Sequence, residues 1–333
     1  MLAGGGRSSI LVHMYERIIS LENLFDAWHE FLRGKRKRKD IAEFAENLSQ
    51  NIYQLHNDLK NKIYVHGGYH AFNISDPKPR NIHKATVRDR LLHHAIYRVL
   101  YPYFDKKFIH DSYSCRLNKG THKAIERFRQ LGHSVSKNNT KQCFILKCDV
   151  KKFFASIDHQ TLINILKKYI RDQDVIWLLE KIIGSFSQGL PLGNLTSQLL
   201  VNIYMNEFDQ FVKHALKIKH YVRYADDFVI FSADKEELIA NLKHIRFFLE
   251  ENLKLSLHPN KVFIKTLYAG LDFLGWLHFP YHRVLRTTTK KRMFKNLLTN
   301  PKEERFSSYL GMLKWGNTHK LASAVEKLHS ALV

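Results

Sequence analysis

Three aspartates are the residues of this sequence whose types and spacing could do chemistry. Asp226 and Asp227 are adjacent in YVRYADDFVIFS, residues 221–232, a stretch otherwise rich in aromatic and β-branched residues. Asp149 ends the apolar run CFILKCD, residues 143–149. The strand formers on both sides of the acid pair predict a hairpin with the two acids at its tip. The apolar run predicts a buried strand that ends on a carboxylate.

These acids suggest a metal site if an antiparallel sheet places the two elements side by side. Two unit charges about 4 Å apart repel by roughly 4 kcal/mol at an effective dielectric near 20, which is large beside a total stability of about 5–15 kcal/mol. Hard divalent cations such as Mg²⁺ would neutralise the cluster, and two of them about 4 Å apart promote in-line phosphoryl transfer. Two alternatives remain open. The acids are ordinary turn residues that bond their own backbone, or Lys151, Lys152 or Arg223 neutralises them.

Composition indicates a globular protein with a polyanionic partner. The chain has 333 residues with 44% hydrophobic content, enough for one large or two to three ordinary domains. Its 53 Lys+Arg against 31 Asp+Glu give a formal net charge of +22, which favours nucleic acid as the partner. The sequence has no apolar run of about 18 residues, so we expect no membrane span. Cys115, Cys143 and Cys148 are odd in number and lack CxxC spacing, which argues against a disulfide framework and a zinc site and fits a cytoplasmic location.

Periodicity predicts a mixture of helices and strands around these acids. Residues 1–13 show no pattern and are expected to be a flexible leader, with Met14 as the natural start. The segment SDPKPRNIHKA, residues 75–85, is expected to be extended because of its prolines. The tail from 283 onward carries 11 Lys+Arg and 3 Asp+Glu and is expected to be a small basic helical module. Helices are expected at 14–32, 40–60, 87–104, 120–131, 159–183, 195–216 and 235–252, and further strands at 262–267 and 272–279.

Five ordered motifs resemble those of the reverse transcriptase palm. They are CDVKKFFASIDH, LPLGNLTSQLL, YADD, LSLHPNKV and FLGW, and the resemblance runs from about residue 60 to about residue 280. It implies an α+β right-hand polymerase with fingers, an antiparallel-sheet palm and a short helical thumb. The implied divisions are a leader at 1–13, N-terminal helices and fingers with early palm segments at 14–145, the palm at 146–280, and a basic helical thumb at 281–333.

The resemblance also implies roles for the acids. Asp149 and Asp226 would bind two Mg²⁺ ions, for which Mn²⁺ can substitute; the Val150 carbonyl would assist, and Asp227 would complete the acid cluster. Lys261 occupies the position of a general acid for the pyrophosphate leaving group. An ordinary surface lysine is the alternative there.

Further positions are carried over by motif for the incoming dNTP and the nucleic acid. Phe154 resembles the steric gate that rejects a ribose 2′-hydroxyl, with a core aromatic as the alternative. Lys78 and Arg80 match the fingers segment that grips the triphosphate, with an exposed basic loop as the alternative. Tyr113 and Arg116 resemble a template-contacting loop, with a hydrogen-bonded turn as the alternative. The cations expected to contact phosphates of the template RNA and the RNA/cDNA duplex are Lys35, Arg36, Lys37, Arg38, Lys290, Lys291 and Arg292.

The segment PLGNLTSQ separates subfamilies. Leu192, Gly193 and Gln198 resemble the reverse transcriptases of diversity-generating retroelements, where many relatives have Gln before the Gly and Pro after the Ser. That resemblance implies copying of a template-repeat RNA into mutagenised cDNA for retrohoming, with frequent errors at template adenines and a small basic accessory protein. A retron-like or defence-associated reverse transcriptase is the first alternative. A catalytically inactive palm that serves as an RNA-binding scaffold is the second.

Overall fold

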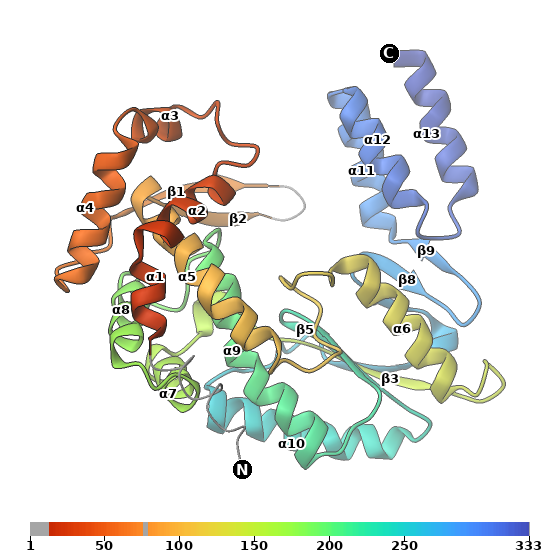
Figure 1. Cartoon of the computed structure of the whole chain (residues 1–333). Coiled ribbons are helices and arrows are strands. Elements are labelled where there is room, and N and C mark those ends of the chain that lie inside the picture. The colour runs from red at the N-terminus through yellow and green to blue at the C-terminus, as the bar shows by residue number, and fades with distance from the viewer. Residues whose placement is uncertain (1–12, 76–78, 333) are drawn as a thin grey trace, which may run out of the picture. The chain divides into compact units, whose positions relative to one another are not determined.

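The computed structural model describes residues 13–75 and 79–332, and these form two compact units (Figure 1). Unit 1 comprises the described residues of 1–110, 150–215 and 246–256, and unit 2 those of 111–149, 216–245 and 257–333. Helix α10, Lys235–Leu253, contributes residues to both. The predicted leader lies almost wholly outside the described residues, as does Lys78.

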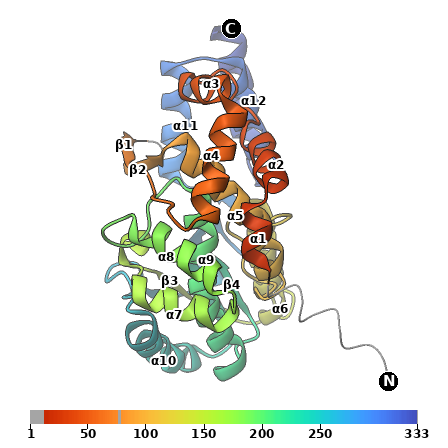
Figure 2. The same ribbon diagram turned by 60° about the vertical axis from the view of Figure 1, so that its left-hand side comes forward.

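Unit 1 is mostly helical and carries one two-stranded sheet. Helix α7 packs against both α8 and α9, and the three helices lie together in both ribbon views (Figures 1 and 2). Its elements are α1 Met14–Ile19, α2 Leu21–Phe31, α3 Lys39–Glu46, α4 Leu48–Lys60, β1 Tyr69–Ile74, β2 Arg80–Ala85, α5 Val87–Asp105, the 3₁₀ turn η2 Phe153–Ser156, α7 His159–Tyr169, α8 Gln173–Gly184, α9 Leu195–Gln210 and the π-helical turn η3 Phe211–Ala215.

Several local features of unit 1 differ from the sequence prediction. The helices expected over 40–60 and 159–183 are each two helices, α3 with α4 and α7 with α8. The helix expected over 14–32 is two helices, because Ser20 leaves helical geometry and its Oγ accepts a hydrogen bond from Asn23 N at 3.2 Å, which caps α2. The strand β1 was not predicted; its YHAFNI sequence is largely exposed and has no buried face. It pairs antiparallel with β2, which lies in the segment predicted to be extended.

Unit 2 contains two antiparallel sheets and a helical C-terminal part. Its elements, besides the first part of α10, are α6 Thr121–Val135, β3 Phe144–Asp149, β4 Tyr221–Tyr224, β5 Asp227–Ser232, β6 Phe263–Thr266, the 3₁₀ turn η4 Leu267–Ala269, β7 Leu271–Phe273, β8 Trp276–His278, β9 Arg283–Leu285, α11 Thr287–Thr299, α12 Glu303–Leu313 and α13 His319–Leu332.

The larger sheet has the strand order β4-β5-β3-β6, and all its pairs are antiparallel. Helix α6 covers one face, where Phe128 meets Phe231 edge-on with ring centroids 4.9 Å apart. Ile145 and Val229 complete that core from β3 and β5. Alternate residues of each strand share this face, as strand geometry requires. The predicted strand at 143–149 and the predicted hairpin are confirmed.

The smaller sheet has the order β7-β8-β9 and continues into three helices. The single strand expected over 272–279 is a hairpin, with β7 and β8 joined at 274–275. The tail from 283 begins with a strand before it becomes helical. Trp276 from β8 packs with Met293 and Leu297 of α11 and Phe306 of α12 in a separate core. The assignment of fingers, palm and thumb to residue ranges stays a prediction. No helix in the described part of the chain combines the length and the apolar character that crossing a membrane requires.

Candidate active site

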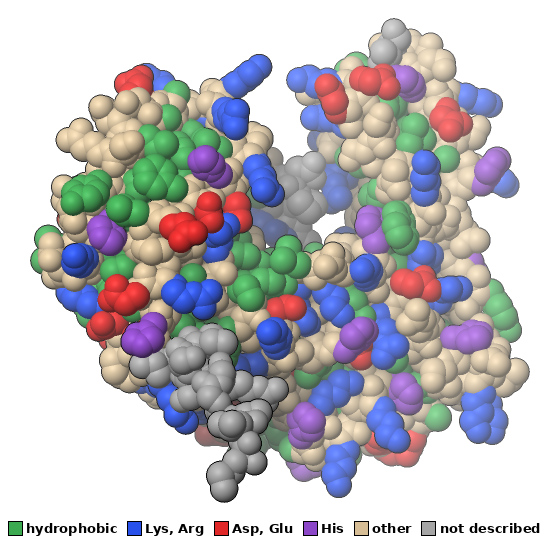
Figure 3. All heavy atoms as spheres, viewed as in Figure 1, with side chains coloured by type: hydrophobic (Ala, Val, Ile, Leu, Met, Phe, Trp, Pro, Cys, Tyr) green, Lys and Arg blue, Asp and Glu red, His purple; other side chains and the backbone are tan. Residues whose placement is uncertain are grey.

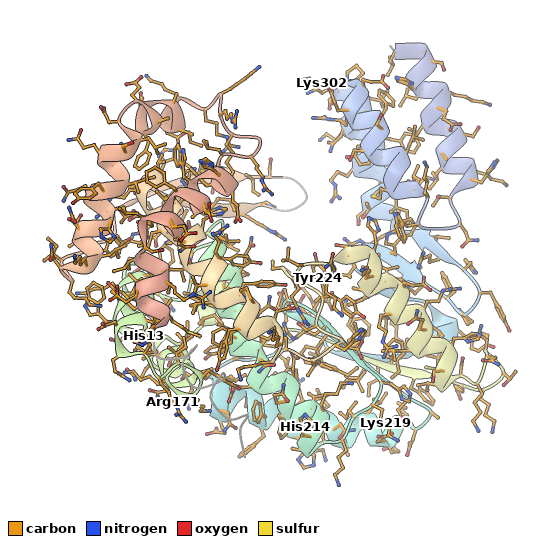
Figure 4. The ribbon with its side chains drawn as sticks, viewed as in Figure 1. His13, Arg171, His214, Lys219, Tyr224 and Lys302 are labelled. Carbon is orange, nitrogen blue, oxygen red and sulfur yellow. The ribbon has the colours of Figure 1, made fainter. Side chains whose placement is uncertain are left out.

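Strand pairing within unit 2 brings the predicted acids together. In the register of β3 against β5, Asp149 lies directly opposite Asp227. Asp227 is also the partner of Tyr224, the last residue of β4, which is labelled in Figure 4. Asp226 occupies the turn between β4 and β5. The predicted convergence of a strand-end carboxylate with a hairpin tip is therefore confirmed by the register.

Two lysines accompany this acid cluster. Lys261 Nζ lies 2.9 Å from Asp149 Oδ1, and the backbone N–H of His258 donates to the Asp149 carbonyl at 2.8 Å. Lys147 Nζ lies 3.1 Å from Asp227 Oδ2 and also donates to the Asp272 carbonyl at 2.6 Å. Lys147 was missed by the sequence analysis. Its signal is simple, since it stands two residues before Asp149 on one strand and so shares its face.

The cations that pair with Asp149 and Asp227 are Lys261 and Lys147, which are not those predicted as neutralising alternatives. Lys151 and Lys152 are exposed residues of unit 1. Arg223 is fully buried, and its guanidinium donates to the Ala225 carbonyl at 3.0 Å and to Ser112 Oγ at 3.1 Å. Because Ala225 adopts a left-handed conformation with φ of 55°, this hydrogen bond holds the strained turn that carries Asp226.

Asp227 is an acid of this cluster whose pKa is shifted by its surroundings. Burial raises its pKa to about 6, against the lowering effect of Lys147, and the neighbouring Asp149 and Asp226 raise it further. Its Oδ1 atom is buried and has no hydrogen-bond partner among the described residues. A buried carboxylate oxygen without a partner is costly, so a bound cation at this point would relieve an existing penalty.

The donor set fits a hard divalent cation. Carboxylate oxygens from facing positions of adjacent strands are the ligand type that such ions prefer. Within residues 13–75 and 79–332, however, no group of three or more His, Cys, Asp and Glu residues is arranged to hold a metal ion. The fit thus rests on Asp149 and Asp227 as register partners and on the unpartnered Asp227 oxygen.

In unit 1, the segment around Leu192 is fixed against strand β2. The Leu192 carbonyl accepts a hydrogen bond from His83 N at 3.0 Å, and Asn194 Nδ2 donates to the His83 carbonyl at 3.1 Å. Gly193 has φ of 107°, and a Cβ there would lie 2.7 Å from Ile82 Cγ2. Only glycine therefore allows this loop and the strand to approach so closely. Gln198 follows within the first turns of α9.

Phe154 lies on the turn η2 and is half-buried. Its carbonyl accepts a hydrogen bond from Leu190 N at 2.8 Å. Gly189 has φ of 66°, and a Cβ there would lie 2.3 Å from that same carbonyl oxygen. The sequence analysis did not single out Gly189, although its place just before PLGN was a usable signal. Val150, buried in unit 1, directly follows Asp149 in the chain.

The predicted phosphate-binding cations that the structure describes in unit 1 are exposed, except for Lys35, which is held by contacts within the protein. Arg80 is exposed at the start of β2, and Arg36, Lys37 and Arg38 are exposed between α2 and α3. Lys35 is different, because its Nζ donates to the Phe31 carbonyl at 2.9 Å and lies 4.4 Å from that ring's centroid. Burial and nearby arginines lower the Lys35 pKa. Lys35 therefore acts first as a helix-end cap.

The segment at 113–120 forms the hydrogen-bonded turn that was the alternative to a template-contacting loop. Tyr113 is a buried residue of the sheet core, and its hydroxyl donates to Asp111 Oδ1 at 3.3 Å. Arg116 Nη1 donates to the Ser112 carbonyl at 3.0 Å, and Gly120 N donates to the Tyr113 carbonyl at 3.0 Å. The hydrogen-bonded turn is thus present, and the Tyr113 ring lies inside the protein. Contact of this loop with a template through Tyr113 and Arg116 stays a prediction.

Helix α11 of unit 2 carries the other predicted cations. Lys290 and Lys291 line a shallow groove with Phe294 and Leu298, the latter 59% exposed, while Arg292 is half-buried. Lysines beside apolar surface suit a sugar–phosphate strand. Figure 3 shows more Lys and Arg than Asp and Glu side chains on the face in view, in keeping with the net charge of +22.

Comparison with known proteins decides the family. The family described as "Reverse transcriptase (RNA-dependent DNA polymerase)" matches residues 74–303, well over half of the chain. The chain belongs to the reverse transcriptase family. As a member it is an RNA-directed DNA polymerase whose template is RNA, and reverse transcriptases as a family use divalent metal ions.

Relatives of this reverse transcriptase include bacterial and intron-encoded proteins. Protein YkfC of Escherichia coli is 28% identical over 286 residues, covering 72% of this chain and 73% of YkfC. The group II intron-encoded protein LtrA of Lactococcus lactis is 24% identical over 340 residues, covering 79% of this chain and 55% of LtrA. The putative COX1/OXI3 intron 2 protein of Saccharomyces cerevisiae is 22% identical, and only 35% of its length is covered. The chain therefore spans only part of its intron-encoded relatives.

Solved structures with a similar fold include two telomerases. Apo telomerase from Candida tropicalis, truncated from its C-terminal domain, gives a TM-score of 0.50 at 12% identity, covering 69% of this chain and 59% of that one. Telomerase from Candida albicans in complex with a fragment of telomeric RNA gives 0.51 at 11% identity, covering 73% and 52%. At such low identity the likeness concerns the fold alone, and it confirms the predicted right-hand polymerase class.

Proposed function

We propose that this reverse transcriptase performs two-metal nucleotidyl transfer with Asp149, Asp226 and Asp227 as its acid cluster. The observation that carries the proposal is the register of β3 against β5, which sets Asp149 opposite Asp227 with Asp226 on the adjoining turn. The Val150 carbonyl is the fourth proposed ligand. Mg²⁺ is the proposed ion, with Mn²⁺ as a substitute, because hard oxygen donors suit both.

The chain's own residues prepare this chemistry. Bound divalent ions would supply charge stabilisation for the attacking and leaving oxygens of an in-line transfer. Asp227 must be ionised to bind a cation, and its pKa of about 6 makes that ionisation nearly complete at neutral pH. Lys261 holds Asp149 at 2.9 Å and carries a proton on Nζ. We propose that the same ammonium group donates that proton to the leaving pyrophosphate.

Motif position supports the proposed dNTP contacts in unit 1. Phe154 is the proposed steric gate against a ribose 2′-hydroxyl, and its turn is fixed by the hydrogen bond from Leu190 N. Arg80, exposed at the start of β2, is the proposed triphosphate contact, as is Lys78 outside the described residues. Gly193 and Gln198 complete the proposed nucleotide-binding set.

The subtype we propose is that of diversity-generating retroelements, in which a template-repeat RNA is copied into mutagenised cDNA for retrohoming. Leu192 supports it, since an aliphatic side chain stands where many relatives have a glutamine. The hydrogen bond from His83 N fixes the Leu192 backbone, so the side chain has a defined place. An apolar group there removes a hydrogen-bonded check on base pairing. A small basic accessory protein is the proposed partner.

Primer extension on an RNA template tests the polymerase proposal. With dNTPs and Mg²⁺, we expect extension by the wild type and none by Asp226→Asn, while both proteins bind primed RNA. RNA binding without extension by the wild type would instead support an inactive RNA-binding scaffold. Strand synthesis that survives Asp226→Asn would remove that residue from the acid cluster.

The error spectrum tests the proposed subtype. We expect frequent wild-type misincorporation opposite template adenines, and several-fold less in Leu192→Gln because the polar group restores discrimination. Leu190→Gln on the preceding turn is not a suitable control because Leu190 is buried. Leu195→Gln, a half-buried position in the same segment, serves instead. Accurate copying of adenines by the wild type would favour a retron-like or defence-associated enzyme.

A further inference from the structure

Unit 2 contains a cavity that the polymerase chemistry does not use. It has a volume of about 340 Å³ and is bounded by α6, by the segment from the end of β8 to β9, and by the loop that joins α12 to α13. These elements neighbour one another within unit 2 in Figure 1. The volume is in the range of small-molecule sites. None of the residues proposed for catalysis or dNTP binding lines it.

The cavity wall carries an excess of positive charge. Arg129, Arg283 and Lys314 face a single carboxylate, that of Glu126. Glu126 Oε1 lies 2.7 Å from Arg129 Nη2, while its Oε2 is 3.9 Å from Arg283 Nη1. No described carboxylate lies within ion-pair distance of Lys314, which is exposed. One acid cannot balance three cations, so the cavity attracts an anion.

Arg283 is the most constrained of these cations. Its backbone N–H donates to Asn317 Oδ1 at 3.2 Å, and its Nε donates to the Trp315 carbonyl. Its Nη1 atom is buried and has no hydrogen-bond partner among the described residues. Burial lowers the Arg283 pKa, Glu126 raises it and Arg129 lowers it. The wall therefore holds a pre-positioned guanidinium whose charge is incompletely compensated.

Aromatic side chains line the cavity beside these cationic residues. Trp315 is 39% exposed and stacks on His122, with ring centroids 4.1 Å apart and an interplanar angle of 17°. Tyr281, on the wall segment between β8 and β9, is 75% exposed. Exposed aromatic rings next to arginine and lysine are how proteins bind nucleobases without reading their sequence. A purely inorganic anion would not need them.

We propose that this cavity binds one nucleotide unit, with its phosphate at Arg283, Arg129 and Lys314 and its base against Trp315 or Tyr281. A free nucleotide and a nucleotide within single-stranded RNA share this chemistry. The site is separate from the acid cluster and from the groove on α11, and it does not depend on the proposed subtype. Its ligand would occupy unit 2 while the acid cluster remains accessible.

Binding to the full-length protein tests the proposal with two probes. One is radiolabelled AMP in equilibrium dialysis, and the other is a fluorescein-labelled single-stranded RNA in an anisotropy titration. We expect Arg129→Ala with Lys314→Ala to raise Kd about tenfold for at least one probe, because two charged contacts are lost. For RNA, the slope of log Kd against log salt should fall by about 1.4. Extension of a saturating primed template should stay at the wild-type rate.

The matched control removes two exposed lysines from α10, as Lys235→Ala with Lys243→Ala. Trp315→Leu is a second test variant, since it keeps the cavity's charge and removes its exposed ring. Weakened AMP binding in the test variants alone identifies a free-nucleotide site, and weakened RNA binding alone identifies a strand-binding site. If both test variants bind both probes as the α10 control does, the proposal is wrong.

Discussion

The candidate residues of the two units are held in different ways. In unit 2 the acids stand on neighbouring strands, and the whole β3–β5 ladder fixes their register. In unit 1 two of the proposed dNTP contacts, Phe154 and Leu192, stand on turns, and single backbone hydrogen bonds from Leu190 and His83 fix them. A strand ladder is held by many hydrogen bonds, so one substitution changes its geometry little. The geometry of a turn depends on one or two residues. Substitutions of the unit 2 acids should thus lower activity without lowering stability. Substitutions in the unit 1 turns should lower stability first.

The largest expected effect is on the acid cluster. Asp149→Asn removes a proposed metal ligand but keeps the side-chain shape, so we expect primer extension to fall by at least about a thousandfold. The Asp149–Lys261 pair is partly exposed, so the free energy of unfolding should change by less than about 1 kcal/mol. Extension rates and urea denaturation measure the two quantities.

Asp272→Asn is the matched control, because Asp272 is a half-buried acid of unit 2 that pairs with Arg286 at 2.7 Å. It should leave extension near the wild-type rate. The comparison would be reversed if Asp149→Asn lowered the free energy of unfolding by several kcal/mol and reduced activity only modestly. The pair of Asp149 with Lys261 would then be structural.

The next effect tests the turns of unit 1. Gly189→Ala places a Cβ 2.3 Å from the Phe154 carbonyl oxygen at a φ of 66°, so we expect a loss of about 2–4 kcal/mol in the free energy of unfolding. Gly184→Ala, at the end of α8 with no atom near its added Cβ, should be neutral or stabilising by up to about 1 kcal/mol. Equal stability of the two variants would show that the turn adapts.

A smaller effect is expected from a buried histidine of unit 2. Burial lowers the pKa of His278 to about 4, from an ordinary value of 6.5. Its contribution to stability is complete above pH 6.5 and is lost as the pH falls toward 4, because only the unfolded chain then takes up the proton. We expect about 2 kcal/mol less stability at pH 5 than at pH 6.5 from this group. His278→Phe should flatten the urea-measured pH profile, and an unchanged profile would assign the loss elsewhere.

The parts of the site that could be predicted from the sequence are those that strand geometry determines. An apolar run ending on Asp149 and a hairpin carrying two acids have one simple antiparallel solution, and the register confirms it. Lys147 was equally accessible, because alternation alone puts it on the Asp149 side. It was missed because a lysine inside an apolar run was not weighed as a partner for Asp227.

The features that were not predicted depend on tertiary packing, which local sequence patterns do not indicate. Strand β1 has no buried face and only a short polar–apolar alternation, so periodicity did not find it. Tyr113 sits in a polar loop by sequence, yet its ring fills the core under α6. Likewise, the close approach of Gly193 to Ile82 joins residues more than a hundred positions apart.

The pairing of Asp149 with Asp227 also limits how this chain can change in length. Losing or gaining one residue inside β3 or β5 would turn one carboxylate to the opposite side of the sheet, since side chains alternate. A two-residue change would restore the side but displace the acid by about 7 Å along the strand. No single ion could then touch both carboxylates. We therefore expect insertions and deletions to be confined to the connections between these strands, such as the long excursion from 150 to 220.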